Sequence, residues 1–392
     1  MNSLKDTIII FILYLFKLGK VKTTHLVIVA LFMFGTWPAF AFDVSQINVG
    51  ANPWAISIDP NTNRIFVTNF GNDSVSVIDG NTNTVIKQIT VNDSPTGIVV
   101  NPDSGLVYVS RLSSHAVTVI DERTFTITSN ITVGTQPNGL GLNPVTGYIY
   151  VTNMGDRTVS VIDGKTNSVI DTIQVQLRPT AVSVNPSTNT LYVTNSGSGT
   201  VSVINTNTNT VSNTIPTGKG PTDVAINLYS NTVYVTDSPT SQIFLIDAKN
   251  NTVLSKIPVG SNPDGVSIDY SKNRIFVANS GNGTVSVIDG NTRMATDVIP
   301  VGKHPFAIAT NPLTGMTYTA NDTPGIVYVI SDNENSTSSL QQQLDAAKSL
   351  AETKTLDKRQ SDDIQNAIVL AEIGIPIGFG VSVSIFIFKT KK

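Results

Sequence analysis

A repeat of 42 residues runs through most of the chain and restricts the folds that it can adopt. It is clearest in a column of prolines that recurs at this step without insertion: Pro53, Pro95, Pro137, Pro179, Pro221, Pro263 and Pro305. A second column ends a run of the type Tyr150-Val-Thr-Asn153 and contains Asn69, Arg111, Asn153, Asn195, Asp237, Asn279 and Asn321. Strict internal periodicity of this kind is the signature of a repeat architecture. The folding unit is therefore the 42-residue repeat.

Each repeat contains four short segments in which apolar residues alternate with period two. In the first repeat they cover residues 55–59, 64–69, 74–79 and 84–89. Short β-branched runs separated by turn residues predict antiparallel strands. Between the first two segments stands a column of Gly and Asn only: Asn63, Gly105, Gly147, Asn189, Asn231, Asn273 and Gly315. Both residue types tolerate the positive φ of a hairpin turn, so the column predicts a tight hairpin in every repeat.

Seven four-stranded units of this length predict an all-β, seven-bladed β-propeller. The seventh repeat ends near Ile330 and lacks its fourth strand. The missing strand is found at the other end of the repeat region, because residues 43–49 match residues 85–91, with Gln46 over Gln88 and Ile47 over Ile89. We therefore expect an N-terminal strand to complete the last blade. Closure of the ring in this way also covers a strand edge that could otherwise aggregate.

The repeat resembles that of the YVTN β-propeller family, which is found in archaeal surface-layer proteins and in exported bacterial propellers. The resemblance covers residues 43–331 and implies the propeller fold and a place at the cell surface. Four positions depart from the pattern: Arg111 and Asp237 in the asparagine column, and Leu228 and Tyr270 where other repeats carry proline. We expect these departures to alter local turns only.

The segment before the repeats, residues 1–41, has the features of a signal peptide or signal anchor. Two apolar stretches are separated by Lys17, Lys20 and Lys22, and Ala39-Phe40-Ala41 follows the second. A basic region, a short apolar region and a small-x-small motif form the pattern that signal peptidase recognises. Cleavage after Ala41 and retention as an uncleaved anchor are both open, and both place the propeller, residues 42–333, outside the cytosol.

Two further segments follow the repeats. Residues 334–372 are predicted to form a polar helical stalk, because Leu340, Leu344, Ala347 and Ala351 make only a narrow apolar stripe, suited to solvent or to weak self-association. Residues 373–388 carry no charge and precede three lysines. This arrangement predicts that residues 373–392 are a C-terminal transmembrane anchor with a cytoplasmic end, or a sorting segment that is removed after export.

Composition excludes several kinds of chemistry. The chain has no cysteine and a formal net charge of −3. Disulfides, thiol catalysis and c-type haem attachment are therefore excluded. The propeller has 14 Lys and Arg against 20 Asp and Glu, a net charge of −6, which disfavours nucleic acid and anionic lipid headgroups as partners. His25 lies in the export signal, and His115 and His304 lie in distant repeats, so we expect no metal site and no cofactor.

Candidate binding residues lie where the first strand of each repeat begins, at the predicted channel mouth. Trp54 and Phe306 follow the prolines of two repeats that closure makes neighbours, and Phe70 lies in an adjoining loop. These three side chains could form an exposed aromatic patch of the kind that marks a binding site, or could simply pack beneath loops. Oxygen donors at the same mouth are predicted from Asn138, Asp223 and Asp264.

Repeated polar positions have a structural interpretation instead. The asparagine column and the aspartates of the Asp79 type recur in nearly every blade, so we expect them to form turns rather than to bind ligands. Seven Asn-x-Ser/Thr sequons are candidates for glycosylation in an exported protein: Asn72, Asn92, Asn130, Asn250, Asn282, Asn321 and Asn335.

These features predict a non-catalytic scaffold at the cell surface, membrane-anchored, that contacts cell-envelope proteins or glycans. Its variable loops, at residues 70–74, 111–115, 154–157 and 322–325, would give specificity. A purely structural lattice protein that self-associates is a second interpretation. The alternative from another class is an exported metal-dependent hydrolase or lyase that uses the channel mouth. Such enzymes carry several carboxylate and amide ligands, a glutamate among them, and no glutamate stands in the first or last strands of the repeats here.

Overall fold

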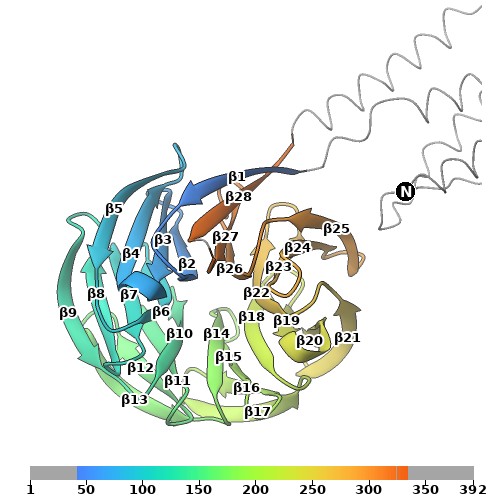
Figure 1. Ribbon diagram of the computed structural model, residues 1–392. Helices are drawn as coiled ribbons and strands as arrows, with labels where there is room; N and C mark the ends of the chain where they lie inside the picture. The colour runs from blue at the N-terminus through green and yellow to red at the C-terminus, as the bar shows by residue number, and fades with distance from the viewer. Residues whose placement is uncertain (1–41, 324, 334–392) are drawn as a thin grey trace, which may run out of the picture. The chain divides into compact units, whose positions relative to one another are not determined.

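The computed structural model describes residues 42–323 and 325–333. Within these residues, 28 strands form seven four-stranded sheets, which are the blades of a ring (Figure 1). The all-β, seven-bladed propeller expected from the repeat is therefore confirmed. The signal segment, the stalk and the C-terminal segment fall outside the described residues. In the described ranges, no helix has the length and apolar character needed to cross a membrane.

The strands of blades 1 to 6 run outward from the central channel in chain order, and in blade 7 the N-terminal strand β1 takes the outermost place. Blades 1 and 2 contain β2 (Pro53–Asp59), β3 (Arg64–Asn69), β4 (Ser74–Asp79), β5 (Thr84–Thr90), β6 (Pro95–Asn101), β7 (Leu106–Arg111), β8 (Ala116–Asp121) and β9 (Thr126–Thr132). Blades 3 and 4 contain β10 (Pro137–Asn143), β11 (Tyr148–Asn153), β12 (Thr158–Asp163), β13 (Ser168–Gln174), β14 (Pro179–Asn185), β15 (Thr190–Asn195), β16 (Thr200–Asn205) and β17 (Thr210–Pro216). Blades 5 and 6 contain β18 (Pro221–Asn227), β19 (Thr232–Asp237), β20 (Gln242–Asp247), β21 (Thr252–Pro258), β22 (Pro263–Asp269), β23 (Arg274–Asn279), β24 (Thr284–Asp289) and β25 (Met294–Pro300). Blade 7 contains β26 (Pro305–Thr310), β27 (Thr317–Asn321), β28 (Ile326–Asp332) and β1 (Phe42–Asn48).

Strand boundaries follow the sequence pattern closely. The inner strands begin two residues earlier than the alternation indicates, because the repeated proline still pairs with the end of the second strand, as Pro53 does with Asn69. Every residue of the predicted Gly and Asn turn column has a positive φ, between 49° and 74°. A side chain branched at Cβ would be strained there. Turn chemistry thus fixes the same hairpin register in all seven blades.

The N-terminal strand closes the ring as predicted. Strand β1 lies beside β28, at the outer edge of the sheet that β26 and β27 complete. The amide N–H of Val49, just after β1, donates to the carbonyl oxygen of Gly325 over 3.0 Å. Ile47 of β1 is buried and packs in one cluster with Tyr318 of blade 7 and Ile65 of blade 1. Closure therefore joins the two ends of the propeller through a shared apolar core.

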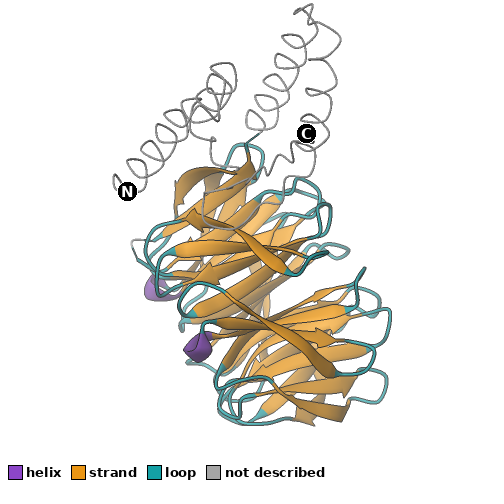
Figure 2. Cartoon of the chain, turned by 90° about the vertical axis from the view of Figure 1, so that its right-hand side faces the viewer, coloured by secondary structure: helices purple, strands orange, loops and turns teal. Residues whose placement is uncertain are grey.

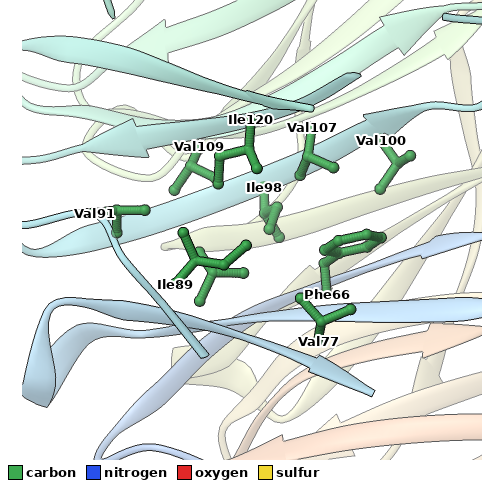
Figure 3. Close-up of a cluster of buried hydrophobic side chains, with 10 residues drawn as sticks. Phe66, Val77, Ile89, Val91, Ile98, Val100, Val107, Val109 and Ile120 are labelled. Carbon is green, nitrogen blue, oxygen red and sulfur yellow. The ribbon is translucent and has the colours of Figure 1, made fainter. Parts of the chain in front are cut away.

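The core of the molecule lies between blades. Figure 3 shows one such layer, in which Phe66 and Val77 of blade 1 face Val107 and Val109 of blade 2. These side chains are fully buried. Because each apolar sheet face is covered only by its neighbour, a single blade could not bury its core alone. The free energy of folding therefore depends on the intact ring.

A repeated hydroxyl joins successive blades near the channel. In blade 3, Thr152 Oγ1 accepts a hydrogen bond from the amide of Gly139 over 2.9 Å and donates to the carbonyl oxygen of Thr180, in blade 4, over 3.0 Å. The same two contacts recur at Thr68, Ser110, Thr194 and Thr236. We call this contact the hydroxyl clamp. It explains in physical terms the threonine of the Tyr-Val-Thr-Asn run.

Blades 6 and 7 have alanine, Ala278 and Ala320, at the clamp position. The joints from blade 6 to blade 7 and from blade 7 to blade 1 therefore cannot form a hydroxyl clamp. These two joints flank the blade that is assembled from both ends of the propeller.

The propeller has two distinct faces, seen from the side in Figure 2. The mouth face is where inner strands begin and second strands end, and it carries both short 3-10 turns, η1 (Phe70–Asn72) and η2 (Ser238–Thr240). The lower face carries the turns between first and second strands and between third and fourth strands. In blade 1 these are residues 60–63 and 80–83.

Candidate functional site at the channel mouth

The residues that follow the repeated prolines form a ring at the mouth face: Trp54, Thr96, Asn138, Thr180, Thr222, Asp264 and Phe306. The threonines are used within the framework. Thr96 donates to the carbonyl oxygen of Pro137 over 3.1 Å, and Thr180 donates to that of Thr222 over 2.9 Å. The positions that depart from threonine are therefore the candidates for a role other than folding.

The three predicted aromatic residues lie together. Trp54, on β2, is the central ring, with its centroid 4.3 Å from that of Phe306 on β26 and 5.4 Å from that of Phe70 in η1. The amide of Phe70 donates to the carbonyl oxygen of Asn52 over 2.9 Å, which holds η1 against the start of blade 1. All three side chains are half-buried, so each keeps an exposed edge. We call this group the aromatic cluster.

The aromatic cluster lies at a joint that has no hydroxyl clamp. In blade 5 the hydroxyl of Thr236 donates to the carbonyl oxygen of Asp264 in the next blade. The corresponding residue is Ala278 in blade 6 and Ala320 in blade 7, so the carbonyl oxygens of Phe306 and Trp54 receive no such hydrogen bond. At the joint between blades 7 and 1, the rings of Phe306 and Trp54 pack against each other. The chain therefore departs from the repeated hydroxyl at the joint where Phe306 and Trp54 pack together.

A carboxylate stands beside this cluster. Asp264 is the second residue of β22, whose neighbour in the next blade is β26, the strand of Phe306. Burial raises the pKa of Asp264, the nearby charge of Asp322 raises it further, and hydrogen bonds to the hydroxyls of Ser280 and Ser238 oppose both effects. Oδ1 of Asp322 is buried and accepts no hydrogen bond within the described chain. The mouth thus offers oxygen acceptors next to aromatic rings.

Asp223 lies deeper, on the wall of the channel. Its two carboxylate oxygens accept hydrogen bonds from the amides of Val224, over 2.8 Å, and of Val266 in the next blade, over 2.9 Å. Burial raises its pKa from 3.8 to about 6, against the effect of these two hydrogen bonds. The equivalent positions of the other blades hold only small residues: Ala55, Gly97, Gly139, Ala181, Gly265 and Ala307. Asp223 is therefore the one channel residue of its row that can carry a charge.

The structure does not bring all predicted donors together. Asn138 lies in blade 3, away from the blades of the aromatic cluster, and its Nδ2 is 3.4 Å from Sδ of Met154. Within the residues that the structure describes, no three acidic or histidine side chains gather as the ligands of a metal ion. His115 and His304 lie in loops of blades 2 and 7, as predicted.

The repeated asparagines and aspartates form turns and corners, as expected. Nδ2 of Asn153 donates to the hydroxyls of Thr158 and Ser160, each over 2.9 Å. Asp237, which replaces asparagine in blade 5, accepts backbone hydrogen bonds from Lys219 and Gly220 through Oδ1. Asp79 accepts the amide of Asn81 over 2.8 Å and closes an Asx turn. The departures from the pattern therefore leave each blade intact.

The sequence did not single out every acidic residue of interest. The sequence pattern places Asp322 only in a variable loop, because its proximity to Asp264 depends on the angle between blades 6 and 7. Glu122 is buried beside Asp59 at the lower face, where burial first and the Asp59 carboxyl second raise its pKa to about 7. No sequence motif indicates that Glu122 and Asp59 lie close together, because they belong to different blades.

The predicted glycosylation sites divide into two groups. Exposed asparagines are found at five of them: Asn72, Asn92, Asn130, Asn250 and Asn282. The prediction for Asn321 is wrong for the folded propeller, because this side chain is fully buried and donates to the carbonyl oxygens of Val301 and Lys303 over 2.8 Å each. Asn321 belongs to the corner-forming column and happens to precede Asp-Thr. Asn335 lies outside the described residues.

Comparisons with known proteins support the propeller fold. A YNCE-like β-propeller family model matches residues 102–266, which is less than half of the chain. A solved chain described as Kuenenia stuttgartiensis hydrazine synthase superposes with a TM-score of 0.67 at 19% sequence identity, covering 72% of this chain and 96% of that chain. Identity this low shows a common fold alone. No curated protein matches the chain in sequence.

Proposed function

We propose that this β-propeller is an exported, non-catalytic binding scaffold of the cell surface, held near a membrane and engaging cell-envelope proteins or glycans through its mouth face. Two features of the sequence support the location: the export signal expected in residues 1–41 and the apolar C-terminal segment. The resemblance of the repeat to archaeal surface-layer propellers supports the class of function.

The aromatic cluster is the observation on which the proposal depends. In a chain of near-identical blades, positions that follow the repeat are explained by folding. Trp54 and Phe306 replace threonine or a polar residue of the mouth ring, and the clamp hydroxyls are missing at the same joints. Natural sequences break their local rules mainly at functional sites. The cluster therefore fits a binding role better than a packing role alone.

Recognition at this site combines flat apolar faces with acidic acceptors. The exposed edges of Trp54, Phe70 and Phe306 would lie against the apolar face of a sugar ring or against an apolar side chain of a protein. The carboxylates of Asp264 and Asp322 would accept hydrogen bonds from hydroxyl, amide or ammonium groups of the ligand. The closed ring holds these groups at fixed spacing, which reduces the ordering cost of binding.

The fluorescence of Trp54 provides a direct test. The chain has two tryptophans, and a Trp37→Phe variant of the full chain leaves Trp54 as the reporter. We expect titration with solubilised envelope polysaccharide or envelope protein to shift its emission to shorter wavelength, and Phe306→Ala to weaken the apparent affinity at least tenfold. Tyr229→Ala, on the lower face, is the matched control and should not change it. Binding that is unaffected by Phe306→Ala would refute the proposed site.

The rival hypotheses give different results in the same protein. Saturable binding of calcium or zinc that is abolished by Asp264→Ala and by Asn138→Ala would favour a metal-dependent hydrolase or lyase. Ordered assembly of the purified chain without any other component would favour a structural lattice.

A further inference from the structure

We infer that the lower face of the propeller docks on the surface of a lipid bilayer, with the channel mouth directed away from it. The inference rests on the proposed function, because it assumes a propeller held near a membrane. It adds the orientation of the ring and the residues that touch the lipid.

The four most exposed large hydrophobic side chains of the described chain lie on the lower face. Tyr229 is 81% exposed, Val145 77%, Leu313 74% and Met294 67%. The first three stand in turns between first and second strands, in blades 5, 3 and 7, and Met294 follows the last turn of blade 6. Single exposed apolar residues are common on protein surfaces. All four lie on one face, whereas the most exposed such residue in a loop of the mouth face, Leu177, is only 40% exposed, and this asymmetry needs a cause.

Blade 5 and blade 6 extend this surface. Leu228 and Tyr270 occupy the turn position that proline holds in the other five blades. The hydroxyl of Tyr270 donates to the carbonyl oxygen of Ile226 over 2.9 Å, and its ring meets that of Tyr229 edge to face at 6.0 Å. Tyr270 thereby supports Tyr229, which projects into solvent. We call Val145, Tyr229, Met294 and Leu313 the tip residues.

Both ends of the ring also lie at the lower face. In blade 7, Ile330 pairs with Thr317, the residue that follows the turn of Leu313, so β28 runs toward that face. Strand β1 runs the opposite way, because Val49 at its end contacts Gly325 at the mouth. The chain therefore enters and leaves the ring on the side of the tip residues. The sequence beyond each end contains an apolar stretch, within residues 1–41 and at residues 373–388.

The spacing of the tip residues fits a lipid surface better than a protein partner. They belong to blades 3, 5, 6 and 7, so they project from separate turns of one face. A bilayer is planar and fluid, and it can accept each tip separately. Tyrosine in particular favours the membrane–water interface, where its ring is apolar and its hydroxyl remains hydrated. Because the propeller has a net charge of −6, we expect insertion of tips rather than charge attraction, and hence little dependence on salt.

Labelling with a lipid-borne quencher tests the orientation. The chain has no cysteine, so single substitutions give unique labelling sites. Tyr229→Cys and Leu313→Cys report on the lower face, and Ser113→Cys and Lys303→Cys, both exposed at the mouth, are the matched controls. Each full-length variant is labelled with a small fluorophore and reconstituted into phosphatidylcholine vesicles that contain nitroxide-bearing lipid. Flotation of the vesicles reports association independently.

We expect the lower-face labels to be quenched at least threefold more than the mouth labels. Combined Val145→Ser, Tyr229→Ser and Leu313→Ser substitutions should reduce the quenching of a label at Met294→Cys, whereas Ile86→Ser and Val298→Ser on the outer rim should not. Equal quenching on both faces, in protein that floats, overturns the inference and leaves the membrane location intact. Self-quenching of tip labels that rises with protein density would assign the face to a second copy instead. Failure to float overturns both.

Discussion

At the scale of single residues, the clamp hydroxyl gives the clearest case of a repeated side chain with a defined task. Thr152 joins Gly139 in its own blade to Thr180 in the next, through two hydrogen bonds of 2.9 and 3.0 Å. Its removal leaves a backbone amide and a carbonyl without their partner. Buried unsatisfied groups cost about 1–3 kcal/mol. Ala278 and Ala320 have no hydroxyl, so the joints after blades 6 and 7 lack this stabilising pair of hydrogen bonds.

We predict opposite effects for two matched substitutions at the clamp position. Thr152→Ala should lower the free energy of unfolding by about 1–3 kcal/mol. Ala278→Thr should raise it by about 1 kcal/mol, since the new hydroxyl can accept from Gly265 and donate to Phe306 as its counterparts do. Chemical denaturation of the two variants beside the parent checks both signs. A loss of stability in Ala278→Thr would contradict this account of the joint.

Asp223 gives a prediction about pH. Its carboxyl has a pKa near 6 in the folded chain against 3.8 when unperturbed, so the folded state holds the proton more tightly. The contribution is fully present below about pH 4 and is lost as the pH rises to about 6. Over this pH window the free energy of unfolding of the parent should therefore fall by up to about 3 kcal/mol relative to that of Asp223→Ala. Solvent in the channel screens the charge and reduces this difference. Denaturation of both proteins at several pH values measures the difference, and Asp223→Asn should behave like the alanine variant. Parallel curves would show that Asp223 does not titrate as described.

The residues that could be predicted are those whose position the repeat defines. Trp54, Phe70 and Phe306 were expected together because closure makes blades 7 and 1 neighbours, and the ring distances confirm it. Asp322 and the clamp hydroxyls were not expected, because their contacts cross from one blade to the next. Contacts of this kind depend on the orientation of one blade relative to the next, which the sequence pattern does not specify.

At the scale of elements, β1 is the strand on which the ring depends most. Its buried side chains are Phe42 and Ile47, and Ile47 packs with Val67 of blade 1 and Val327 of blade 7. Its pairing was predictable because residues 43–49 repeat the pattern of a fourth strand. The early start of each inner strand was not, since proline is a poor strand former and its pairing here occurs beside a register shift.

Substitutions within β1 should separate its buried side from its exposed side. Ile47→Ala should lower the free energy of unfolding by about 2–4 kcal/mol, because it removes a buried side chain from the core at the closure. Val44→Ala, on the exposed side, should change it by less than about 0.5 kcal/mol. Thermal and chemical unfolding of the two variants provide the comparison. Equal, small effects would argue against a packed β1.

At the scale of the whole molecule, closure connects the fold to both proposed surfaces. It brings Phe306 to Trp54 at the mouth, and it places both chain ends at the lower face with the tip residues. The fold was predictable because seven copies of one pattern reinforce each other. The confinement of exposed apolar tips to one face was not, because Tyr229 and Leu313 are ordinary turn residues until the ring defines a face.

Hydrogen exchange of residues 42–48 in the full-length protein tests this closure most directly. If β1 is the outer strand of blade 7, its amides should exchange slowly, with protection similar to that of β5, the equivalent strand of blade 1. Exchange at the rate of an unstructured peptide, while β26, β27 and β28 remain protected, would contradict a ring completed by its N-terminal strand.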